Sequence, residues 1–405
     1  MKEEIILKLK KYDQMHLIKF YDELKETEKN YIENQIEKID FDQVDKLYET
    51  TKEEKKYSDK IEPMKYIDKY KLSEDERKHY AQIGDEIIKN GEYAVATMAG
   101  GQGTRLGHIG PKGTFELIDG KSLFEIFSDE MKKANKKYGV VIPWYIMTSE
   151  ENNDETVNFF EEKKYFGYPK NYIKFFKQGK LPMIDTKGKI LLESKWKIKE
   201  AADGNGGIFR SMIKYNILDE IKQNNIKWLF IGSIDNAILK MVDNIFLGLT
   251  QEKKMLAASK TVSKANPHEK VGVFCKRNGK PSVIEYSELP EEMATMRDEY
   301  GELFYGEAHI MCNLFNTSIL EKIGKENLPY HVAFKKSSYI DGDGNLIEPD
   351  EPNAFKFESF IFDSFAKLND ILLMRAKREE EFAPVKNKEG VDSPETAREL
   401  YLKNK

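Results

Sequence analysis

The sequence predicts an α/β protein with a core of buried parallel strands, and two observations carry this prediction. From about Tyr93 onward, short apolar runs alternate with helical stretches and glycine-rich turns. This pattern is typical of βαβ units, whose ligand sites lie at the carboxyl ends of the strands. A glycine-rich loop directly follows the first run, Tyr93–Met98. The 405 residues are long enough for more than one domain, at roughly 150 residues each.

The first 90 residues have a different pattern, rich in lysine, glutamate, aspartate and tyrosine. Their apolar residues recur at steps of three and four, as in Leu17, Ile18, Tyr21 and Leu24 and then in Ile32, Ile36 and Ile39. Such stripes predict amphipathic helices that pack on a larger body. We therefore expect residues 1–90 to form an N-terminal helical region.

Four apolar runs are the candidate strands of a central region, residues 91–370: Tyr93–Met98, Val140–Met147, Trp228–Ile234 and Met255–Ala258. In the same region, Val273–Cys275 and Val283–Tyr286 flank the turn signal Asn278-Gly279. Asn-Gly between two apolar runs is the strongest short-range signal for a β-hairpin.

The last segment, residues 371–405, is polar and charged after Arg375. Pro394 follows Ser393 at the start of a stretch with helical spacing. Because proline is favoured in the first turn of a helix, we expect a helix over Ser393–Leu402.

Composition limits the functional classes. The 65 basic and 70 acidic side chains give a net charge of −5, which argues against a general nucleic-acid binder. The longest apolar run, Tyr138–Met147, includes Pro143 and is well short of the roughly 20 residues of a membrane helix. The N-terminus carries acidic residues and no small-residue cleavage site, unlike a signal peptide. Cys275 and Cys312 belong to no metal-ligand cluster and are expected to be buried. We expect a cytoplasmic protein with no nucleic-acid or membrane partner.

The glycine-rich loop is the sharpest local feature, and from Met98 to Gly107 it reads Met-Ala-Gly-Gly-Gln-Gly-Thr-Arg-Leu-Gly. Glycines let the backbone turn tightly and bring its N–H groups against phosphate oxygens. Arg105 and Lys112 would add positive charge for a polyphosphate. The spacing fits neither a Walker loop, because Lys112 precedes Gly113, nor the dinucleotide fingerprint. The alternative is a plain turn between a strand and a helix.

These residues resemble a known family. Gly100–Gly107 followed by Pro111-Lys112-Gly113 is similar to the signature of sugar-1-phosphate nucleotidyltransferases. More narrowly, it resembles the eukaryotic-type UDP-N-acetylglucosamine pyrophosphorylases and their UDP-sugar pyrophosphorylase relatives. Further blocks agree in order along the chain: Ile142–Glu150, Phe175–Gly179, Asp203–Gly207, Val271–Val273, Val283–Glu288, His331–Lys336 and Glu381–Asn387. The resemblance implies a Rossmann-like nucleotidyltransferase core with a mixed sheet (91–370), between the helical region 1–90 and a short C-terminal segment (371–405).

The resemblance also implies a reaction, the reversible transfer of UMP from UTP to a sugar 1-phosphate with release of pyrophosphate. A sugar-phosphate oxygen attacks the α-phosphorus in line, and it is already ionised at neutral pH. Catalysis then reduces to positioning and to charge neutralisation. The sequence has no Ser-His-Asp set and no His-x-His that would suggest a covalent intermediate. We expect UTP and a sugar 1-phosphate as partners and a monomer or weak homo-oligomer.

The same resemblance implies the roles of individual residues. Arg105 and Lys112 are the expected catalytic cations. The expected nucleotide-binding residues are Met98, Ala99, Gly100, Gly101, Lys112, Gln178, Gly204 and Lys356. The expected sugar-phosphate-binding residues are Asn205, Gly272, Glu285, Tyr286, His309, Phe360 and Lys386. A glutamine amide can donate to and accept from a pyrimidine, and a carboxylate such as Glu285 suits sugar hydroxyls.

Asp235 matches the Mg²⁺-binding aspartate of the family. It ends the run Trp228–Ile234, and a hard cation that keeps water and phosphate ligands needs only one or two carboxylates. Three alternatives stay open at this point. Asp235 could cap a following helix, Gly204–Gly207 could be an ordinary loop, and each lysine could be a solvated surface residue.

The expected sugar is N-acetylglucosamine 1-phosphate. His309 stands where the family has an asparagine that meets the sugar, so glucose 1-phosphate and galactose 1-phosphate are the alternatives. Two other classes are a non-catalytic sensor of UTP or UDP-sugar and a glycosyltransferase. A sensor would have no use for Arg105, Lys112 and Asp235 together. A glycosyltransferase usually has an Asp-x-Asp motif, whereas Asp235 is followed by Asn-Ala.

Overall fold

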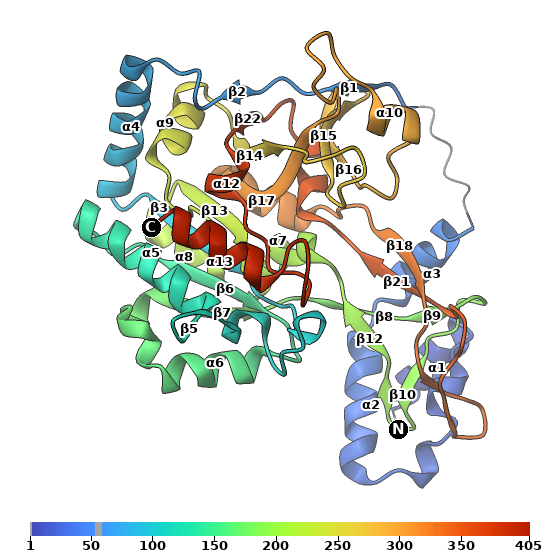
Figure 1. Ribbon diagram of the computed structural model, residues 1–405. Helices are drawn as coiled ribbons and strands as arrows, with labels where there is room; N and C mark the ends of the chain where they lie inside the picture. The colour runs from blue at the N-terminus through green and yellow to red at the C-terminus, as the bar shows by residue number, and fades with distance from the viewer. Residues whose placement is uncertain (1, 53–58) are drawn as a thin grey trace. The chain divides into compact units, whose positions relative to one another are not determined.

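The computed structural model describes residues 2–52 and 59–405, which form two compact units (Figure 1). Unit 1 comprises Met1–Ser58, Gly179–Gly207 and Leu328–Phe360, and unit 2 comprises Asp59–Gln178, Ile208–Asn327 and Ile361–Lys405. Each unit is therefore assembled from stretches far apart in the sequence. The units cut across the expected regions 1–90, 91–370 and 371–405, because pairing between distant strands leaves no mark on local composition.

In the described part of unit 2, an 11-stranded mixed sheet has the main order β2-β22-β14-β17-β13-β3-β6-β7. These strands are β2 (Ile67–Asp68), β22 (Leu372–Arg375), β14 (Ala257–Ser263), β17 (Glu307–Asn316), β13 (Trp228–Ser233), β3 (Tyr93–Met98), β6 (Trp144–Thr148) and β7 (Ile173–Lys177). β1 (Ile61–Pro63), β15 (Val273–Arg277) and β16 (Lys280–Ile284) complete the sheet, and β4 (Glu116–Ile118) pairs separately with β5 (Lys121–Ser122).

Four neighbouring strands of this sheet, β13, β3, β6 and β7, are parallel to one another. Every residue of β3 and β6 is buried, as expected for parallel strands covered on both faces. β17 runs antiparallel to both of its neighbours, β13 and β14, and makes the sheet mixed. The predicted α/β class with a mixed sheet is therefore confirmed.

The expected hairpin is also present. β15 and β16 pair antiparallel, and Asn278 and Gly279 between them have φ of +52° and +78°. A positive φ at both central residues is the requirement of a type I′ turn, which explains the Asn-Gly sequence.

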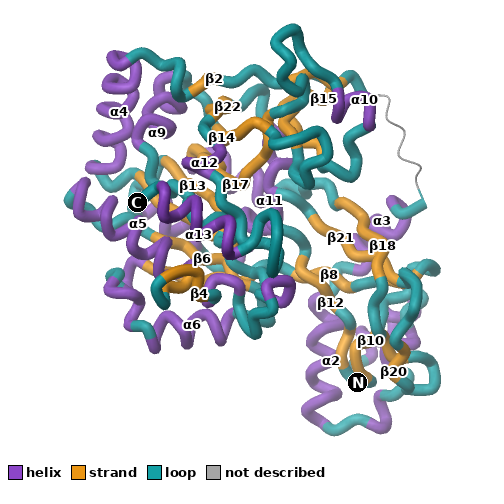
Figure 2. Tube along the Cα trace, in the orientation of Figure 1, coloured by secondary structure: helices purple, strands orange, loops and turns teal. Residues whose placement is uncertain are grey.

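Helices border the sheet strands of unit 2 in Figure 2. They are α4 (Glu74–Lys89), α5 (Leu123–Tyr138), α6 (Asn153–Glu162), α7 (Ile208–Lys214), α8 (Ile217–Gln223), α9 (Asn244–Glu252), α10 (Glu291–Thr295), α11 (Leu320–Lys325), α12 (Arg378–Glu381) and α13 (Pro394–Lys403). α13 confirms the helix expected at Ser393–Leu402, and the Ser393 hydroxyl caps it by accepting from the Thr396 N–H. Cys275 and Cys312 are buried, as expected.

Unit 1 combines helices with short strands. Its helices are α1 (Glu3–Lys11), α2 (Glu26–Lys38) and α3 (Phe41–Thr50), and its strands are β8 (Lys180–Pro182), β9 (Ile184–Asp185), β10 (Leu192–Ser194), β11 (Lys197–Ile198), β12 (Glu200–Ala202), β18 (His331–Lys335), β19 (Tyr339–Ile340), β20 (Leu346–Ile347) and β21 (Ala354–Glu358). Ile32 and Ile36 are buried on α2, as their spacing predicts. Among the described residues, no helix has both the length and the apolarity needed to cross a membrane.

The prediction of an amphipathic helix around Leu17–Leu24 is wrong, because this stretch forms two short 3₁₀ helices, η1 (Met15–Ile18) and η2 (Tyr21–Glu23). Gln14, the residue just before η1, is held in place by its side chain. The side-chain amide donates to the Gly188 carbonyl at 2.9 Å and accepts from the Ile190 N–H at 3.0 Å. Leu17 is still fully buried. The apolar spacing therefore identified the buried face but not the type of helix.

Two helices of unit 2, α4 and α9, run side by side in Figure 1 and touch through glycines. A Cβ atom on Gly84 of α4 would lie 2.0 Å from the Asn244 carbonyl oxygen, and one on Gly248 of α9 would lie 1.8 Å from the Tyr80 carbonyl oxygen. Real side chains cannot approach backbone so closely, so the contact needs glycine at both positions.

We predict that Gly84→Ala destabilises the protein. In an ordinary helix interior, alanine in place of glycine stabilises by about 0.5–1 kcal/mol. Here the two backbones must separate, and we expect the free energy of unfolding in urea to fall by about 1–3 kcal/mol. Gln82→Ala, at an exposed position of the same helix, is the control and should stay within about 0.5 kcal/mol of the wild type. A stabilised Gly84→Ala protein would contradict the close contact.

Candidate active site

The carboxyl ends of the parallel strands of unit 2 bring several predicted residues to one edge of the sheet. Met98 ends β3 and is paired with Ser233 of β13, two residues before Asp235. Gln178 follows β7, and its N–H donates to the Thr148 carbonyl at 2.8 Å. A Cβ atom on Gly100 would lie only 2.9 Å from the Gln178 side-chain oxygen. The glycine loop, the Gln178 amide and Asp235 therefore share this edge.

Hydrogen bonds close the glycine loop on itself. The Lys112 N–H donates to the Gly101 carbonyl at 3.0 Å, and the Gly103 N–H donates to the Gly110 carbonyl at 2.9 Å. The fully buried Asn152 ties the start of the loop down, since its amide donates to the Ala99 carbonyl at 2.9 Å. A loop held in this way presents a fixed set of backbone groups.

Exposure divides the residues of this loop. The side chains of Met98 and Ala99 are buried, so they could reach a ligand only through their backbone. Gly101 and Arg105 are exposed, and in the described part of the chain, beyond the neighbours of Gly101 in sequence, no heavy atom lies within 4 Å of the place where a Gly101 Cβ would be. The open backbone at Gly101 and the Arg105 guanidinium are the parts of the loop that can meet an anion from solvent.

Asp235 lies in the turn after β13, with its side chain 23% exposed. The Lys112 ammonium is 3.9 Å from the Asp235 carboxylate. Burial raises the pKa of Asp235, but the positive charges of Lys112 and Lys386 outweigh it and hold that pKa below its ordinary value. Lys112 therefore pairs with the predicted metal ligand, Lys386 is near enough to act on the same carboxylate, and that carboxylate is ionised at neutral pH.

The alternative that Asp235 caps a helix is wrong. The next helix, α9, begins at Asn244, and its cap is Asp243, whose side chain accepts from the Phe246 N–H at 3.1 Å. The turn at Asp235 leads instead into an irregular segment, so capping does not explain this carboxylate.

The segment that carries Lys386 is bound to Asp235 through its backbone. The Val385 N–H donates to the Asp235 carbonyl at 2.7 Å, and the Lys386 N–H donates to the Asp392 carbonyl at 2.7 Å. The Lys386 ammonium lies 3.9 Å from the Asp392 carboxylate and 5.5 Å from the centre of the Phe382 ring. The structure thus brings together residues that are far apart in the sequence.

Three of the predicted sugar-phosphate residues also meet in unit 2. The His309 N–H donates to the Gly272 carbonyl at 2.9 Å. The Glu285 carboxylate lies 3.3 Å from the position of a Cβ on Gly272, which shows how closely this side chain follows the glycine backbone. Tyr286 is 47% exposed. Gly272, Glu285 and His309 form one cluster at the β15–β16 hairpin and β17.

The His309 side chain is 7% exposed and packs edge-on against Phe274 and Phe362, with ring centres 5.2 and 5.6 Å away. Its Nε2 lies 3.1 Å from the side-chain oxygen of Asn313. Burial lowers the pKa of His309 to about 4, against a smaller opposite effect of the Asn313 hydrogen bond. The imidazole is therefore neutral at pH 7.

Sequence reasoning missed Asn313, which is fully buried and accepts a hydrogen bond from the Ser259 hydroxyl at 2.9 Å. A polar residue inside the apolar stretch Ile310–Phe315 was the available signal. Because a buried amide needs partners, such a residue marks a site of specific hydrogen bonding.

The remaining predicted residues, Gly204, Asn205, Lys356 and Phe360, belong to unit 1. Gly204 has φ of +88°, and a Cβ on it would lie 2.1 Å from the Ser359 carbonyl oxygen. The Gly206 N–H donates to that same carbonyl at 2.9 Å, within the 3₁₀ helix η7 (Asn205–Gly207). Glycine is needed at 204 for the backbone itself, so its contact with a base stays a prediction.

Lys356 lies on β21 with its ammonium 2.8 Å from the Glu358 carboxylate, and both side chains are about a quarter exposed. It is therefore not a freely solvated surface lysine. Its role toward a phosphate, like those of Asn205 and Phe360, stays a prediction.

In the described residues, Asp235 is not part of a larger cluster of possible metal ligands. No group of three or more His, Cys, Asp or Glu side chains in the described residues is arranged to hold a metal ion. An ionised single aspartate suits a hard cation that takes its other ligands from water and phosphate, as Mg²⁺ does, and does not suit a closed protein site.

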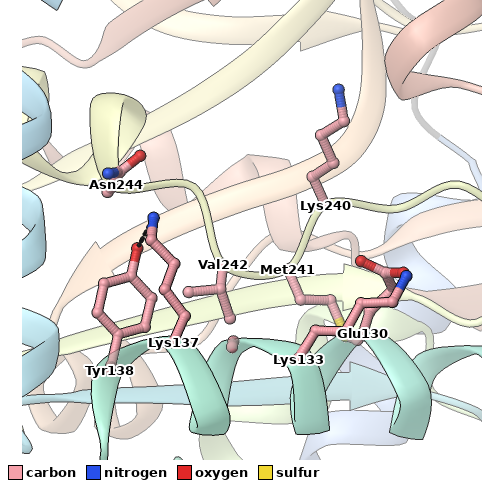
Figure 3. Close-up of a pocket in the computed structure, with 9 residues that line it drawn as sticks. Glu130, Lys133, Lys137, Tyr138, Lys240, Met241, Val242 and Asn244 are labelled. Atoms are coloured by element: carbon pink, nitrogen blue, oxygen red, sulfur yellow. Dashed lines mark hydrogen bonds and ion pairs between the residues drawn. The ribbon is translucent and has the colours of Figure 1, made fainter. Parts of the chain in front are cut away.

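A separate pocket of about 270 Å³ lies in unit 2 between α5 and the segment 240–244 (Figure 3), and it contains none of the predicted residues. Its lysines have acidic neighbours. The Lys133 ammonium is 2.7 Å from Glu130, that of Lys137 is 3.7 Å from Asp85, and that of Lys240 is 3.6 Å from Glu381. This pocket therefore offers an anionic substrate no excess of positive charge.

Comparison with known proteins agrees with this geometry. Residues 27–391 match the model of a family described as UTP–glucose-1-phosphate uridylyltransferase. The chain is 39% identical over 338 residues to a UDP-N-acetylglucosamine pyrophosphorylase of Saccharomyces cerevisiae, covering 80% of this chain and 71% of that one. It is 34% identical to UDP-N-acetylglucosamine diphosphorylase 2 of Arabidopsis thaliana, covering 99% and 83%. Its structure resembles that of the Trypanosoma brucei uridine diphosphate N-acetylglucosamine pyrophosphorylase in complex with an inhibitor, with a TM-score of 0.83, 29% identity, and 98% and 84% of the two chains covered.

We predict that the His309 imidazole titrates near pH 4 rather than near 6.5. The unfolded chain takes up this proton below about pH 6.5, while the folded protein does not until about pH 4. The free energy of unfolding should therefore fall as the pH is lowered through this window, by about 1.4 kcal/mol per pH unit from this group.

Urea unfolding between pH 4.5 and 6.5 measures this slope, and His309→Gln should reduce it. His268→Gln, at a largely exposed histidine, is the control and should leave the slope unchanged. The prediction fails if NMR places the His309 midpoint near 6.5.

Proposed function

We propose, because this chain belongs to the UTP–glucose-1-phosphate uridylyltransferase family, that it transfers UMP from UTP to N-acetylglucosamine 1-phosphate. The chain is a nucleotidyltransferase, as its family and its relatives are. The observation that carries the proposal is the ionised Asp235, 3.9 Å from Lys112 and bonded through its carbonyl to the segment of Lys386, at the carboxyl ends of parallel strands and next to the glycine loop.

The reaction needs no protein nucleophile. An oxygen of the sugar phosphate forms a bond to the α-phosphorus of UTP, and the bond from that phosphorus to the pyrophosphate oxygen breaks. The backbone N–H groups of the glycine loop and the Arg105 guanidinium bind phosphate oxygens. The Lys112 ammonium offsets the negative charge that develops on the departing pyrophosphate, and the Lys386 ammonium, expected at the sugar phosphate, offsets the charge shared by the attacking phosphate and the α-phosphate. One phosphoanhydride replaces another, which makes the reaction reversible.

We propose that Asp235 holds Mg²⁺. The low pKa of this residue provides the ionised oxygen ligand that a hard cation requires. When bound, Mg²⁺ supplies charge neutralisation to the phosphate oxygens. The protein contributes the carboxylate itself and the fixed turn after β13 that carries it.

The choice of sugar rests on the relatives. The yeast and Arabidopsis proteins are named for UDP-N-acetylglucosamine, whereas the family description names glucose 1-phosphate. Within unit 2, the Glu285 carboxylate beside Gly272 is suited to accept hydrogen bonds from sugar hydroxyls. The second candidate is therefore the transfer of UMP to glucose 1-phosphate by the same site.

We predict that Lys112→Ala folds but loses most of its activity. Removing an ammonium group from the phosphate site should lower kcat for pyrophosphate release by about 10²–10³-fold. The measurement uses UTP, Mg²⁺ and N-acetylglucosamine 1-phosphate, with circular dichroism to check the fold. Lys89→Ala, at an exposed lysine at the end of α4, is the control and should keep wild-type rates. Wild-type turnover in Lys112→Ala would exclude the assigned role.

We predict that UDP-N-acetylglucosamine is the best substrate in the reverse direction. The wild-type enzyme is given pyrophosphate and one UDP-sugar at a time (N-acetylglucosamine, glucose or galactose), and UTP formation is followed. The highest kcat/KM should belong to UDP-N-acetylglucosamine. A preference for UDP-glucose would favour the second candidate. Tight UTP binding without turnover on any sugar would instead indicate a sensor.

A further inference from the structure

The residue after Asp235, Asn236, uses both ends of its side chain to bind the backbone of another segment. Its amide nitrogen donates to the Glu381 carbonyl at 2.7 Å, and its amide oxygen accepts from the Ala383 N–H at 2.9 Å. The side chain is 1% exposed. The Asn236 side chain therefore cannot contact a ligand from solvent. Instead it binds two stretches of the chain together, and we call this pair of hydrogen bonds the clamp.

Backbone hydrogen bonds continue this clamp on both sides. The Ala237 N–H donates to the Ala383 carbonyl at 3.0 Å, the Val385 N–H donates to the Asp235 carbonyl at 2.7 Å, and Asn236 and Pro384 form an antiparallel bridge. We call residues 381–386 the strap. The clamp joins the turn that carries Asp235 to the strap, whose last residue is Lys386.

The other end of the strap is fixed by charge. The Glu381 carboxylate and the Lys260 ammonium are both fully buried and lie 2.9 Å apart, and the same ammonium is 2.9 Å from the Asp243 carboxylate. Lys69 adds a second ammonium, 2.9 Å from Asp243 and 3.6 Å from Glu381. Lys69, Asp243, Lys260 and Glu381 form what we call the buried ion cluster.

This cluster is costly to break. Removing one partner of a buried, hydrogen-bonded ion pair is strongly destabilising, because it leaves the other charge buried without compensation. Burial lowers the pKa of Lys260, but Asp243 and Glu381 outweigh it and raise that pKa above its usual value. Lys260 therefore stays charged. Glu381 is held at its side chain by the cluster and at its carbonyl by Asn236, so the strap starts from a fixed point.

A lysine at the end of a long, flexible side chain positions its charge only as well as its backbone is positioned. The strap includes no helix or strand after α12, so the ladder of bonds at Asn236 replaces regular structure there. We propose that Asn236 is a positioning residue, whose amide fixes the strap so that the Lys386 ammonium, paired with Asp392, is held near the turn of Asp235 at the reacting phosphates. This inference rests on the proposed function of the same site.

The test is a double-mutant cycle between Asn236→Ala and Lys386→Ala. If Asn236 acts through Lys386, the loss of the clamp should lower kcat/KM with UTP by about 10–100-fold in the wild type, since small misplacements in a site cost this much. In the Lys386→Ala background, the same substitution should cost less than about threefold, because the group that it positions is gone.

Thermal unfolding separates this role from a purely structural one. Asn236→Ala should lower Tm by the same amount in both backgrounds, because the clamp bonds do not involve the Lys386 side chain. Non-additive activity together with additive stability supports the inference. Additive losses of kcat/KM, equal within about threefold in the two backgrounds, overturn it.

Two further variants keep the test decisive. Asn236→Ser, which retains a group able to make one of the two bonds, takes the place of Asn236→Ala if the latter does not fold. Asn135→Ala is the matched control: its side-chain oxygen accepts from the Ile142 N–H at 3.0 Å, between α5 and β6 and away from the carboxyl ends of the strands. Its effect on kcat/KM should be the same in both backgrounds, and coupling as large as that of Asn236 would overturn the inference.

The two proposals fail in different ways. If the wild type binds UTP but transfers UMP to no sugar phosphate, the proposed function is wrong. In that case the UTP dissociation constants of the same four proteins are measured by calorimetry, and the coupling is calculated from them. Coupling above about threefold in that constant supports the positioning role of Asn236, and coupling below it overturns that role.

Discussion

The attraction between two ammonium groups, those of Lys112 and Lys386, and the carboxylates of Asp235 and Asp392 is the interaction on which the site of unit 2 depends. Asp235, Lys112 and Lys386 come from three separate segments, and each charge would be unfavourable alone in this half-buried place. Together they keep the aspartate ionised and hold two cations where a polyphosphate can meet them. A chain with a net charge of −5 has no general affinity for anions. The cations at this edge are placed by the fold rather than by the overall charge of the chain.

The sheet supplies that geometry in two ways. The parallel strands β13, β3, β6 and β7 end at a common edge and place the glycine loop, Gln178 and Asp235 there. The antiparallel β17 adds an irregularity: its register with β14 shifts between Ser259 and Thr261, and Met311 has φ of +57°. Bulges re-aim side chains, and His309 and Asn313 lie on either side of this one. Lys260, the residue between Ser259 and Thr261, enters the buried ion cluster. The bulge between β14 and β17 therefore lies beside both His309, a predicted sugar-phosphate residue, and Lys260, which holds Glu381 at the start of the strap.

The sequence predicted what depends on neighbours in the chain. The strands, the Asn278-Gly279 hairpin, the glycine loop and the helix after Ser393 all carry local signals, and the family resemblance supplied the candidate residues. Contacts between distant segments left no such signal. Asparagine is common in turns, so Asn236 gave no sign of a clamp, and nothing around Lys260 marked it as buried. Glu381 ends an acidic run, Glu379–Glu381, that is typical of a solvated surface. The two units, each built from separate stretches, were hidden for the same reason.

The chemistry explains why so much buried polarity surrounds so few reacting groups. When the attacking oxygen and the leaving group are both phosphates of the substrates, the protein has no bond of its own to make and can accelerate the reaction only by placing charge. Lysine is a flexible carrier of charge, so its backbone must be fixed. Apolar packing would usually attach an irregular segment with equal or greater stability than a buried amide and a buried ion cluster. Attachment alone therefore does not explain these polar groups. Their hydrogen bonds depend on orientation, so they fix the backbone of the Lys386 segment in one arrangement.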